Sequence, residues 1–182
     1  MDKLLDLTRD FDAAKAAFEA YLDEYDRADD KIHLKIVHTY GVVDAAEDIA
    51  RRMGLDEEDV QLAKVIGLLH DIGRFEQIKR YNTFSDADSV DHAKFGADLL
   101  FKDGLISTFL NGMVKCTGYK PGALEDRYSS DGVFLYDRLN KSDMEMLELA
   151  IRCHNMYRIP QGLNSREQVF CNVLRDADKV DI

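Results

Sequence analysis

Hydrophobic residues recur every three or four positions along most of the chain, which is the spacing of one face of an α-helix. The first apolar stripe consists of Phe11, Ala14, Phe18, Tyr21, Leu22 and Tyr25. A second stripe spans about residues 31–53 and ends at Gly54, which suits the left-handed turn that closes many helices. The strict alternation of a β-strand is almost absent, so the pattern predicts an all-α fold.

The next helices are marked by their polar ends. Asp56 is suited to cap a third helix that runs to His70. A fourth helix is expected from about Ser89 to Lys102, and a weaker apolar segment covers Leu105 to Val114.

Two capping boxes predict the starts of the last two helices, one opening at Ser142 and the other at Ser165. Two other segments are interpreted as loops, Phe75 to Asp88 and Tyr119 to Gly132. Neither repeats nor a linker interrupt the chain. We therefore expect one domain over residues 1–182, with an N-terminal helix in 1–30 and the functional core in 31–182.

The charge of the chain restricts its partners. Of the 182 residues 32% are charged, and the formal net charge is −11. A nucleic-acid polymer is not expected as a partner, because binding its phosphates requires a basic surface. A small phosphorylated substrate remains compatible with this charge, while the oligomeric state cannot be read from it.

Location is predicted from what the sequence lacks. It has no apolar run of membrane-spanning length, and Met1–Asp6 does not resemble the start of a signal peptide. Cys116, Cys153 and Cys171 form no CxxC pair, which is typical of free thiols in a reducing compartment. We expect a cytoplasmic protein without membrane contact.

The adjacent His70 and Asp71 are the most informative polar residues. They follow the apolar run Val65–Leu69, at the point where a buried helix is expected to stop. Burying an imidazole and a carboxylate without partners is costly. Both are ligand types of catalytic divalent cations, so the pair predicts a metal site.

Four more ligand-type residues occupy positions on apolar helical faces: His38, His92, His154 and Asp178. A single histidine in such a place is usually a hydrogen-bonded core residue. Several helices that each present one are explained more simply by a shared polar centre. His33 is rotated to another face and is left out.

These six candidates are too many for one small ion with an open position, so they favour two ions between helices. Asp71 is the natural bridge between them. Imidazole suits zinc, iron, nickel and cobalt, and carboxylate extends the choice to manganese and magnesium, so the identity of the metal stays open.

Three motifs, in this order, resemble those of the HD-domain metal-dependent phosphohydrolase superfamily: His38, His70-Asp71 and Asp178. The flanking residues Leu69–Arg74 and Asp176–Asp181 are similar to that superfamily's second and last motifs. The resemblance covers residues 31–182 and implies a helical HD bundle. The chain ends four residues after Asp178, where relatives usually continue, which indicates a minimal domain or a shortened chain.

Two further segments resemble motifs of dinuclear members, Asp91–Gly96 and Cys153–Asn155. They imply the version with six ligands and two metals. Ile159–Leu163 faintly resembles the end of the HD-GYP branch, which hydrolyses cyclic dinucleotides. The glycine signature of that branch is missing, and Arg74 stands where it usually has lysine, so this activity is not expected.

The resemblance implies hydrolysis of a small phosphate ester, with a nucleotide as the expected class. Two cations roughly 3.5–4 Å apart would hold the phosphoryl oxygens and lower the pKa of a water. His38, His70 and Asp178 are assigned to one ion, His92 and His154 to the other, and Asp71 to both.

Arg74 is the best candidate for stabilising phosphate charge, because a guanidinium binds two phosphate oxygens at once. Weaker phosphate candidates are Lys79, Arg80 and Lys94. Each of these cations also suits a surface ion pair. Tyr81, Thr83 and Phe84 lie in the same region and either shape a substrate pocket or pack as an ordinary loop.

Two alternatives use the same ligand set. Some HD-fold proteins are di-iron oxygenases, and nothing in the ligand types excludes iron. A non-catalytic, metal-stabilised domain that binds nucleotides in signalling is the other alternative. The sequence does not identify the substrate.

Overall fold

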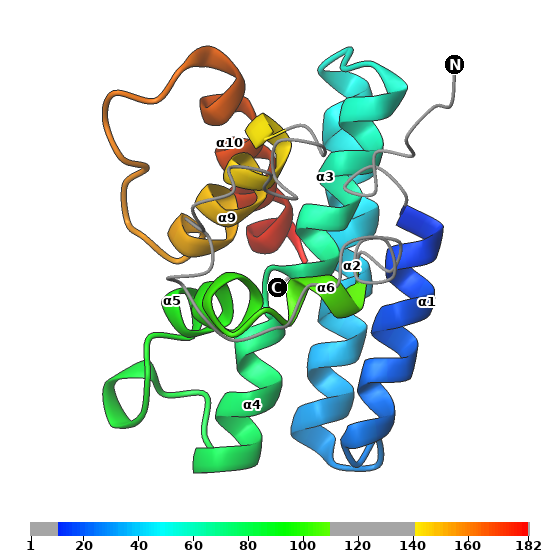
Figure 1. Ribbon diagram of the computed structural model, residues 1–182, viewed down its shortest axis with the longest axis vertical. Coiled ribbons are helices and arrows are strands. Elements are labelled where there is room, and N and C mark those ends of the chain that lie inside the picture. Colours follow the sequence, from blue (N-terminus) through cyan, green and yellow to red (C-terminus); the bar gives the residue numbers. More distant parts are fainter. Residues whose placement is uncertain (1–10, 110–140, 182) are drawn as a thin grey trace, which may run out of the picture.

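The computed structural model describes residues 11–109 and 141–181 (Figure 1), and these residues contain helices and no strand. The predicted all-α fold is therefore confirmed. The elements, in chain order, are α1 (Phe11–Tyr21), η2 (Leu22–Glu24), α2 (Asp30–Arg52), α3 (Glu57–Leu69), α4 (Ile72–Tyr81), η3 (Asp86–Asp88), α5 (His92–Ala97), η4 (Asp98–Lys102), α6 (Ile106–Phe109), α9 (Lys141–Cys153) and α10 (Ser165–Val180).

Helix α3 lies at the centre of the fold. It packs against α1 and α2 on one side and against α9 and α10 on the other (Figure 1). Helix α4 follows α3 after a short break and packs against α5, which in turn contacts α9. The bulkiest fully buried aromatic side chains are Phe18, Phe75, Phe109 and Phe170. One core thus extends from α1 to α10, and the break between α3 and α4 lies inside it.

The ends of α2 and α3 follow from local signals, of which Gly54 and Asp56 were predicted and Asp29 was not. The Asp29 carboxylate accepts hydrogen bonds from two backbone N–H groups and begins α2, and Gly54 follows its end with a φ of +75°. The Asp56 carboxylate accepts the Asp59 N–H and begins α3. Each cap satisfies amides that the first turn leaves unpaired.

The predicted loop over Phe75–Asp88 is wrong in its first half, because α4 occupies this stretch up to Tyr81. Phe75 and Ile78 are buried and form a short apolar face, which the surrounding charged residues obscure in the sequence. The helix ends at Asn82, in the left-handed conformation with φ of 53°. The true loop therefore joins Asn82 to α5.

The next predicted helix begins three residues later than expected, at His92, because the Asp91 side chain caps it through the Lys94 N–H. It changes to a π-helix at Asp98 and ends at Lys102. Of the weak apolar segment predicted from Leu105 onward, α6 covers Ile106–Phe109, and residues 110–114 lie outside the described part.

The last helix also starts at a different cap from the predicted one. Asn164, not Ser165, is the N-cap of α10, and its side chain and that of Glu167 form a reciprocal capping box. Helix α9 is already helical at Lys141, so Ser142 does not precede it as predicted. The predicted loop Tyr119–Gly132 lies outside the described residues.

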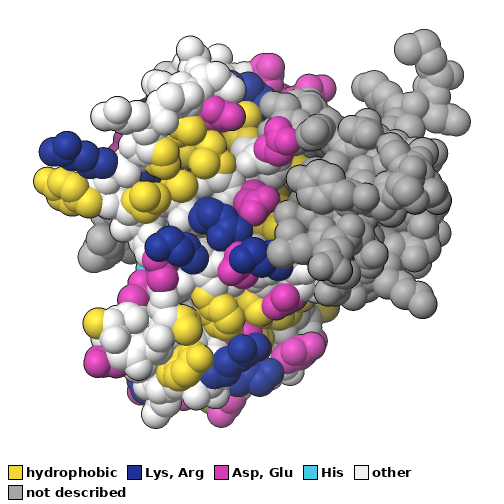
Figure 2. All heavy atoms as spheres, turned by 60° about the vertical axis from the view of Figure 1, so that its left-hand side comes forward, with side chains coloured by type: hydrophobic (Ala, Val, Ile, Leu, Met, Phe, Trp, Pro, Cys, Tyr) yellow, Lys and Arg dark blue, Asp and Glu magenta, His cyan; other side chains and the backbone are white. Residues whose placement is uncertain are grey.

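The surface is mixed in charge. On the face shown in Figure 2, basic and acidic side chains lie beside one another between hydrophobic ones. Cys153 and Cys171 are buried free thiols, while Cys116 lies outside the described residues. Among the described helices, none has the length and apolarity needed to cross a membrane.

Candidate metal centre

His70 and Asp71 form the break between α3 and α4. His70 follows the last residue of α3, and Asp71 precedes the first residue of α4. An aspartate in this N-cap position usually accepts hydrogen bonds from the first turn. The Asp71 side chain accepts none of them and is buried instead among histidines. The carboxylate thus stays available to bind something else.

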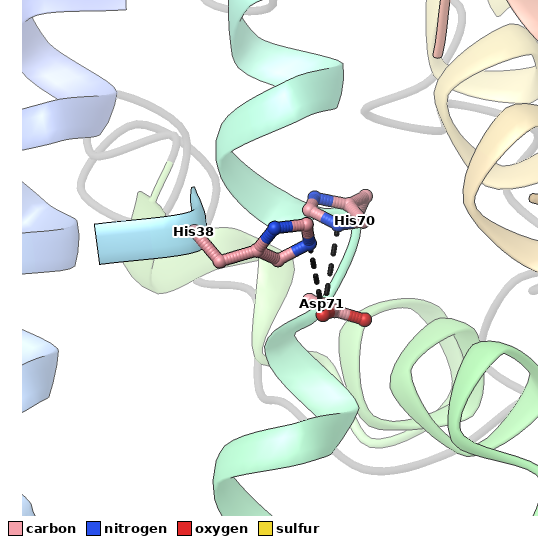
Figure 3. Close-up of side chains that lie close together, drawn as sticks. All are labelled: His38, His70 and Asp71. Carbon is pink, nitrogen blue, oxygen red and sulfur yellow. Dashed lines mark ion pairs between the residues drawn. The ribbon is translucent and has the colours of Figure 1, made fainter. Parts of the chain in front are cut away.

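The two carboxylate oxygens of Asp71 face two different pairs of histidines. Oδ2 lies 3.7 Å from Nε2 of His38 and 3.6 Å from Nε2 of His70 (Figure 3). Oδ1 lies 3.6 Å from Nε2 of His92 and 3.5 Å from Nε2 of His154. Each pair forms with Asp71 a group compact enough to hold a metal ion. Asp71 belongs to both groups.

Asp178 joins the first of these groups. Its Oδ1 is 3.0 Å from Nε2 of His38 and 3.6 Å from Nε2 of His70. Asp176 and His33, which were not chosen as ligands, are exposed. The structure therefore brings all six predicted ligand residues together, although they come from five separate segments of the chain.

The two most buried histidines are oriented by their own helices. Nδ1 of His70 lies 2.7 Å from the carbonyl oxygen of Gly67, and Nδ1 of His154 lies 2.7 Å from that of Ile151. A carbonyl only accepts hydrogen bonds, so each Nδ1 carries the proton. Nε2 of each ring then faces Asp71, and Nε2 of His154 also lies 3.1 Å from Nε2 of His92. Fixed imidazoles of metal sites have this orientation.

The other two histidines are oriented by carboxylates that the sequence analysis did not select. Nδ1 of His38 lies 3.0 Å from Oδ2 of Asp181, and Nδ1 of His92 lies 2.6 Å from Oδ2 of Asp86. Such carboxylate–imidazole pairs fix the ring and increase the basicity of the ligating nitrogen. Asp181 follows α10 and Asp86 lies in the loop before α5, where each resembles an ordinary surface acid in sequence.

Two close approaches depend on glycine. A Cβ on Gly41 would overlap the Asp181 carboxylate, and a Cβ on Gly73 would overlap the carbonyl oxygen of His92. The absent side chains let α10 reach His38 and let α5 pack directly on the start of α4. These glycines therefore position ligands from both groups.

Protonation states in the site suit metal binding. Burial by itself would raise the pKa of Asp71, but His70, His154 and Lys35 lower it well below its usual value. Burial likewise acts to raise the pKa of Asp178, but the hydrogen bond with His38 and the nearby His70 ring lower it overall. Both carboxylates are thus ionised at neutral pH.

The histidine rings respond to the same environment. Burial is the main effect that lowers the pKa of His92, so this ring is neutral and able to ligate. Hydrogen bonding to Asp178 raises the pKa of His38. A cation binding at His38 would therefore release a proton in the pH range where that ring is still charged.

One buried atom indicates a missing partner. Nε2 of His70 is fully buried without a hydrogen-bond partner, although it lies 3.6 Å from an oxygen of Asp71 and 3.6 Å from one of Asp178. Buried polar atoms are almost always satisfied. A divalent cation between these atoms would satisfy His70, and the imidazole and carboxylate donors fit such an ion.

Two cations flank Asp71, one on each oxygen. Nζ of Lys35 lies 2.8 Å from Oδ2, and Nε of Arg74 lies 4.0 Å from Oδ1. The Phe84 ring lies 5.5 Å from the Lys35 nitrogen and 5.8 Å from the Arg74 guanidinium carbon. Lys35 was not predicted, although its position one turn before His38 on the same helix was a usable signal.

The weaker phosphate candidates have other partners. Lys79 and Arg80 both pair with Glu76, at 3.5 Å and 3.0 Å. Lys94 pairs with Asp91 at 3.0 Å. Each is an exposed side chain paired with an acid three or four residues away, and a role in phosphate binding stays a prediction for all three.

Comparison with known families gives one match. The family model described as HD domain matches residues 36–181, a range that contains all six ligand candidates and most of the described helices. Neither the curated proteins nor the solved structures contain a match to this chain.

Proposed function

The chain belongs to the HD-domain family of metal-dependent phosphohydrolases, and from this premise we propose that it hydrolyses a small phosphate ester, with a nucleotide as the expected class. The observation that carries the proposal is the division of the Asp71 oxygens between His38 with His70 and His92 with His154. A carboxylate facing two imidazole pairs is what a site for two ions requires.

The six candidate ligands would be divided between two metal ions. His38, His70 and Asp178 would hold one divalent ion, His92 and His154 the other, and Asp71 both. Such ions supply Lewis acidity and lower the pKa of a bound water to about 7. The Nδ1 hydrogen bonds would keep the histidine rings aligned.

The substrate would enter beside α2 and α10. The side chains of His38 and Asp178 are 13% and 29% exposed, whereas His70 and His154 are almost completely buried. Lys35, which is 16% exposed, contacts the Asp71 oxygen that faces His38. A phosphate approaching there would meet the ligand groups before any buried part of the core.

Arg74 would stabilise the site without moving. One of its nitrogens, Nη1, donates to the Phe84 carbonyl oxygen at 2.7 Å and to Asp86 Oδ1 at 2.8 Å. Nε is buried without a partner and lies on the Oδ1 side of Asp71. The guanidinium would thus keep a fixed positive charge next to the reacting phosphate.

Elemental analysis of protein purified without chelator, together with a phosphoester panel, tests the proposal. We expect two metal ions per chain and turnover that chelator abolishes. Asp178→Ala should lose metal and turnover, and Asp176→Ala, two residues away and exposed, is its matched control.

Three results would contradict the proposal. A protein that binds two metal ions but hydrolyses no phosphoester of the panel would rule out the proposed hydrolase activity. Iron together with substrate-dependent dioxygen uptake would establish the oxygenase alternative instead. Tight nucleotide binding without turnover would establish the non-catalytic, signalling alternative.

A further inference from the structure

Lys35 is a half-buried ammonium held at the carboxylate that both histidine pairs face. It projects from α2, three residues before His38, and its Nζ donates to Oδ2 of Asp71 at 2.8 Å. Its side chain is only 16% exposed. Oδ2 is also the oxygen that faces His38 and His70, so Lys35 occupies an oxygen that the first ion would need.

Lys35 and Arg74 differ in how firmly they are held. Arg74 Nη1 donates to Gln77 as well as to Phe84 and Asp86, which fixes the guanidinium. Among the described residues, the Lys35 ammonium donates a hydrogen bond to Asp71 alone. A lysine ammonium also has a flexible four-carbon stem and three rotatable donors. Of the two cations, Lys35 is therefore the one able to move.

A cation held between His38 and His70 would repel the Lys35 ammonium at short range and favour its release from Oδ2. The Phe84 ring, 5.5 Å from Nζ, covers one side of the ammonium. The four-carbon stem of Lys35 can still swing the ammonium away from Oδ2. Because the stem starts on α2 three residues before His38, the displaced ammonium would stay within reach of a phosphate bound at the candidate metal centre.

The charges of the site also restrict the substrate. The carboxylates in contact with the histidines are those of Asp71, Asp86, Asp178 and Asp181. With Lys35 and Arg74 as cations and neutral histidines, two negative charges remain. Two divalent ions with a neutral bound water would reverse this to two positive charges, which is the state that the substrate meets before that water loses its proton. A phosphomonoester dianion neutralises that charge, whereas a phosphodiester, with one negative charge, does not.

We propose that Lys35 binds the substrate's phosphate and that the site is built for a phosphomonoester dianion. The proposal rests on the proposed function, since it assumes the two-ion site. It adds a residue that the HD motifs do not include, and it selects one ester class.

Lys35→Met tests the proposal, because methionine keeps much of the apolar stem and removes the charge. Lys64→Met is a closely matched control. The Lys64 side chain is 15% exposed, its Nζ lies 3.0 Å from Glu47, and it lies 4.4 Å above the Phe11 ring. Lys64 thus reproduces the burial, ion pair and ring contact of Lys35 away from the candidate metal centre.

The readouts are the affinity of the metal-loaded protein for inorganic phosphate, by calorimetry, and kcat/KM for p-nitrophenyl phosphate and bis(p-nitrophenyl) phosphate. In Lys35→Met, phosphate affinity and monoester kcat/KM should each fall roughly 10- to 100-fold, as expected for a lost charged hydrogen bond. Diester kcat/KM should change much less. Lys35→Arg should recover part of the loss, and Lys64→Met should match the wild type.

The metal affinity of Lys35→Met distinguishes phosphate binding by Lys35 from a purely structural role of this residue. Lys35→Met should keep two ions, with an affinity in chelator competition equal to or tighter than that of the wild type, because a competitor for Oδ2 is gone. Loss of metal in this variant would overturn the proposal, as would unchanged phosphate affinity. An equal fall in kcat/KM for the monoester and the diester would overturn the assignment of the substrate as a phosphomonoester.

Failure of the proposed function gives a different result. A wild-type protein that holds metal but hydrolyses neither ester contradicts phosphohydrolysis. The phosphate titration still tests Lys35 in that case, because it needs no turnover. A comparable fall in phosphate affinity in Lys64→Met would show that the effect is not specific to Lys35 and would overturn the proposal.

Discussion

The two halves of the candidate metal centre share Asp71 but are built differently. The first half adds His38, His70 and Asp178, whereas the second adds only His92 and His154. The first half draws on the 23 residues of α2 and the 16 of α10. The second half draws on the 6 residues of α5 and on His154, which directly follows the 13 residues of α9. The first half therefore has more negative charge and longer supporting helices.

This difference indicates unequal binding. A second carboxylate attracts a divalent cation, and ligands on long packed helices are held in place before the ion arrives. Arg74, fixed near Oδ1, keeps a positive charge beside the second half, while Lys35 can leave the first. We expect the first half to bind its ion more tightly.

The largest effect is expected at the shared residue. Asp71→Ala should remove both ions and reduce turnover to background, because each half loses a ligand. Asp71→Asn, which keeps the size of the side chain, should show the same loss through charge alone. Elemental analysis and a phosphoester assay measure the effect. If either variant keeps the wild-type metal content and turnover rate, Asp71 is not a ligand in the centre.

The next largest effect is expected when one histidine of either half is removed, and it should differ between the two halves. His92→Ala should lose the weaker ion and keep one ion at nearly wild-type affinity. His38→Ala should weaken the tighter ion and reduce total occupancy further. Calorimetric titration of the chelator-treated variants gives both stoichiometries. Equal losses in the two variants would mean that the halves do not differ as described.

A smaller effect is expected from the carboxylates behind the histidines. Removal of such partners typically costs about 10- to 100-fold in metal affinity. Asp181→Ala should show this loss in the tighter site and Asp86→Ala in the weaker one. Gly41→Ala should reproduce Asp181→Ala, because the added Cβ displaces that carboxylate. Chelator competition measures each affinity. If Asp181→Ala weakened the site of His92, or Asp86→Ala that of His38, the assignment of each carboxylate to its histidine would be contradicted.

The smallest effect is expected outside both halves. His33 is exposed on α2, so His33→Ala should leave metal content unchanged and alter the free energy of unfolding by no more than about 0.5 kcal/mol. Thermal unfolding and elemental analysis check this. Loss of metal in the variant would mean that the choice of helical faces was wrong.

Much of the fold could be predicted because strong local signals agreed. α2 and α3 combine long apolar stripes with aspartate caps and a terminal glycine. α4 was missed because its buried face is short and set among charged residues, so that packing rather than sequence pattern reveals it. The start of α10 was displaced by one residue because Asn164 and Ser165 are both good caps.

The candidate ligands could be proposed because each interrupts an apolar face or, like Asp71, follows a buried run. Asp86 and Asp181 give no such signal, since an acid in a polar segment looks the same whether it faces solvent or an imidazole. Lys35 shares a helix with His38, but helical lysines usually lie in solvent. Contacts between distant segments, which periodicity does not encode, identify these three residues.

Crystallography of the metal-loaded protein with anomalous scattering tests the central claim most directly, because it locates each ion. The account predicts two peaks about 3.5–4 Å apart. One should lie by Asp71 Oδ2 with His38, His70 and Asp178, and the other by Oδ1 with His92 and His154. A single peak, or two peaks without Asp71 between them, would contradict the shared two-ion centre.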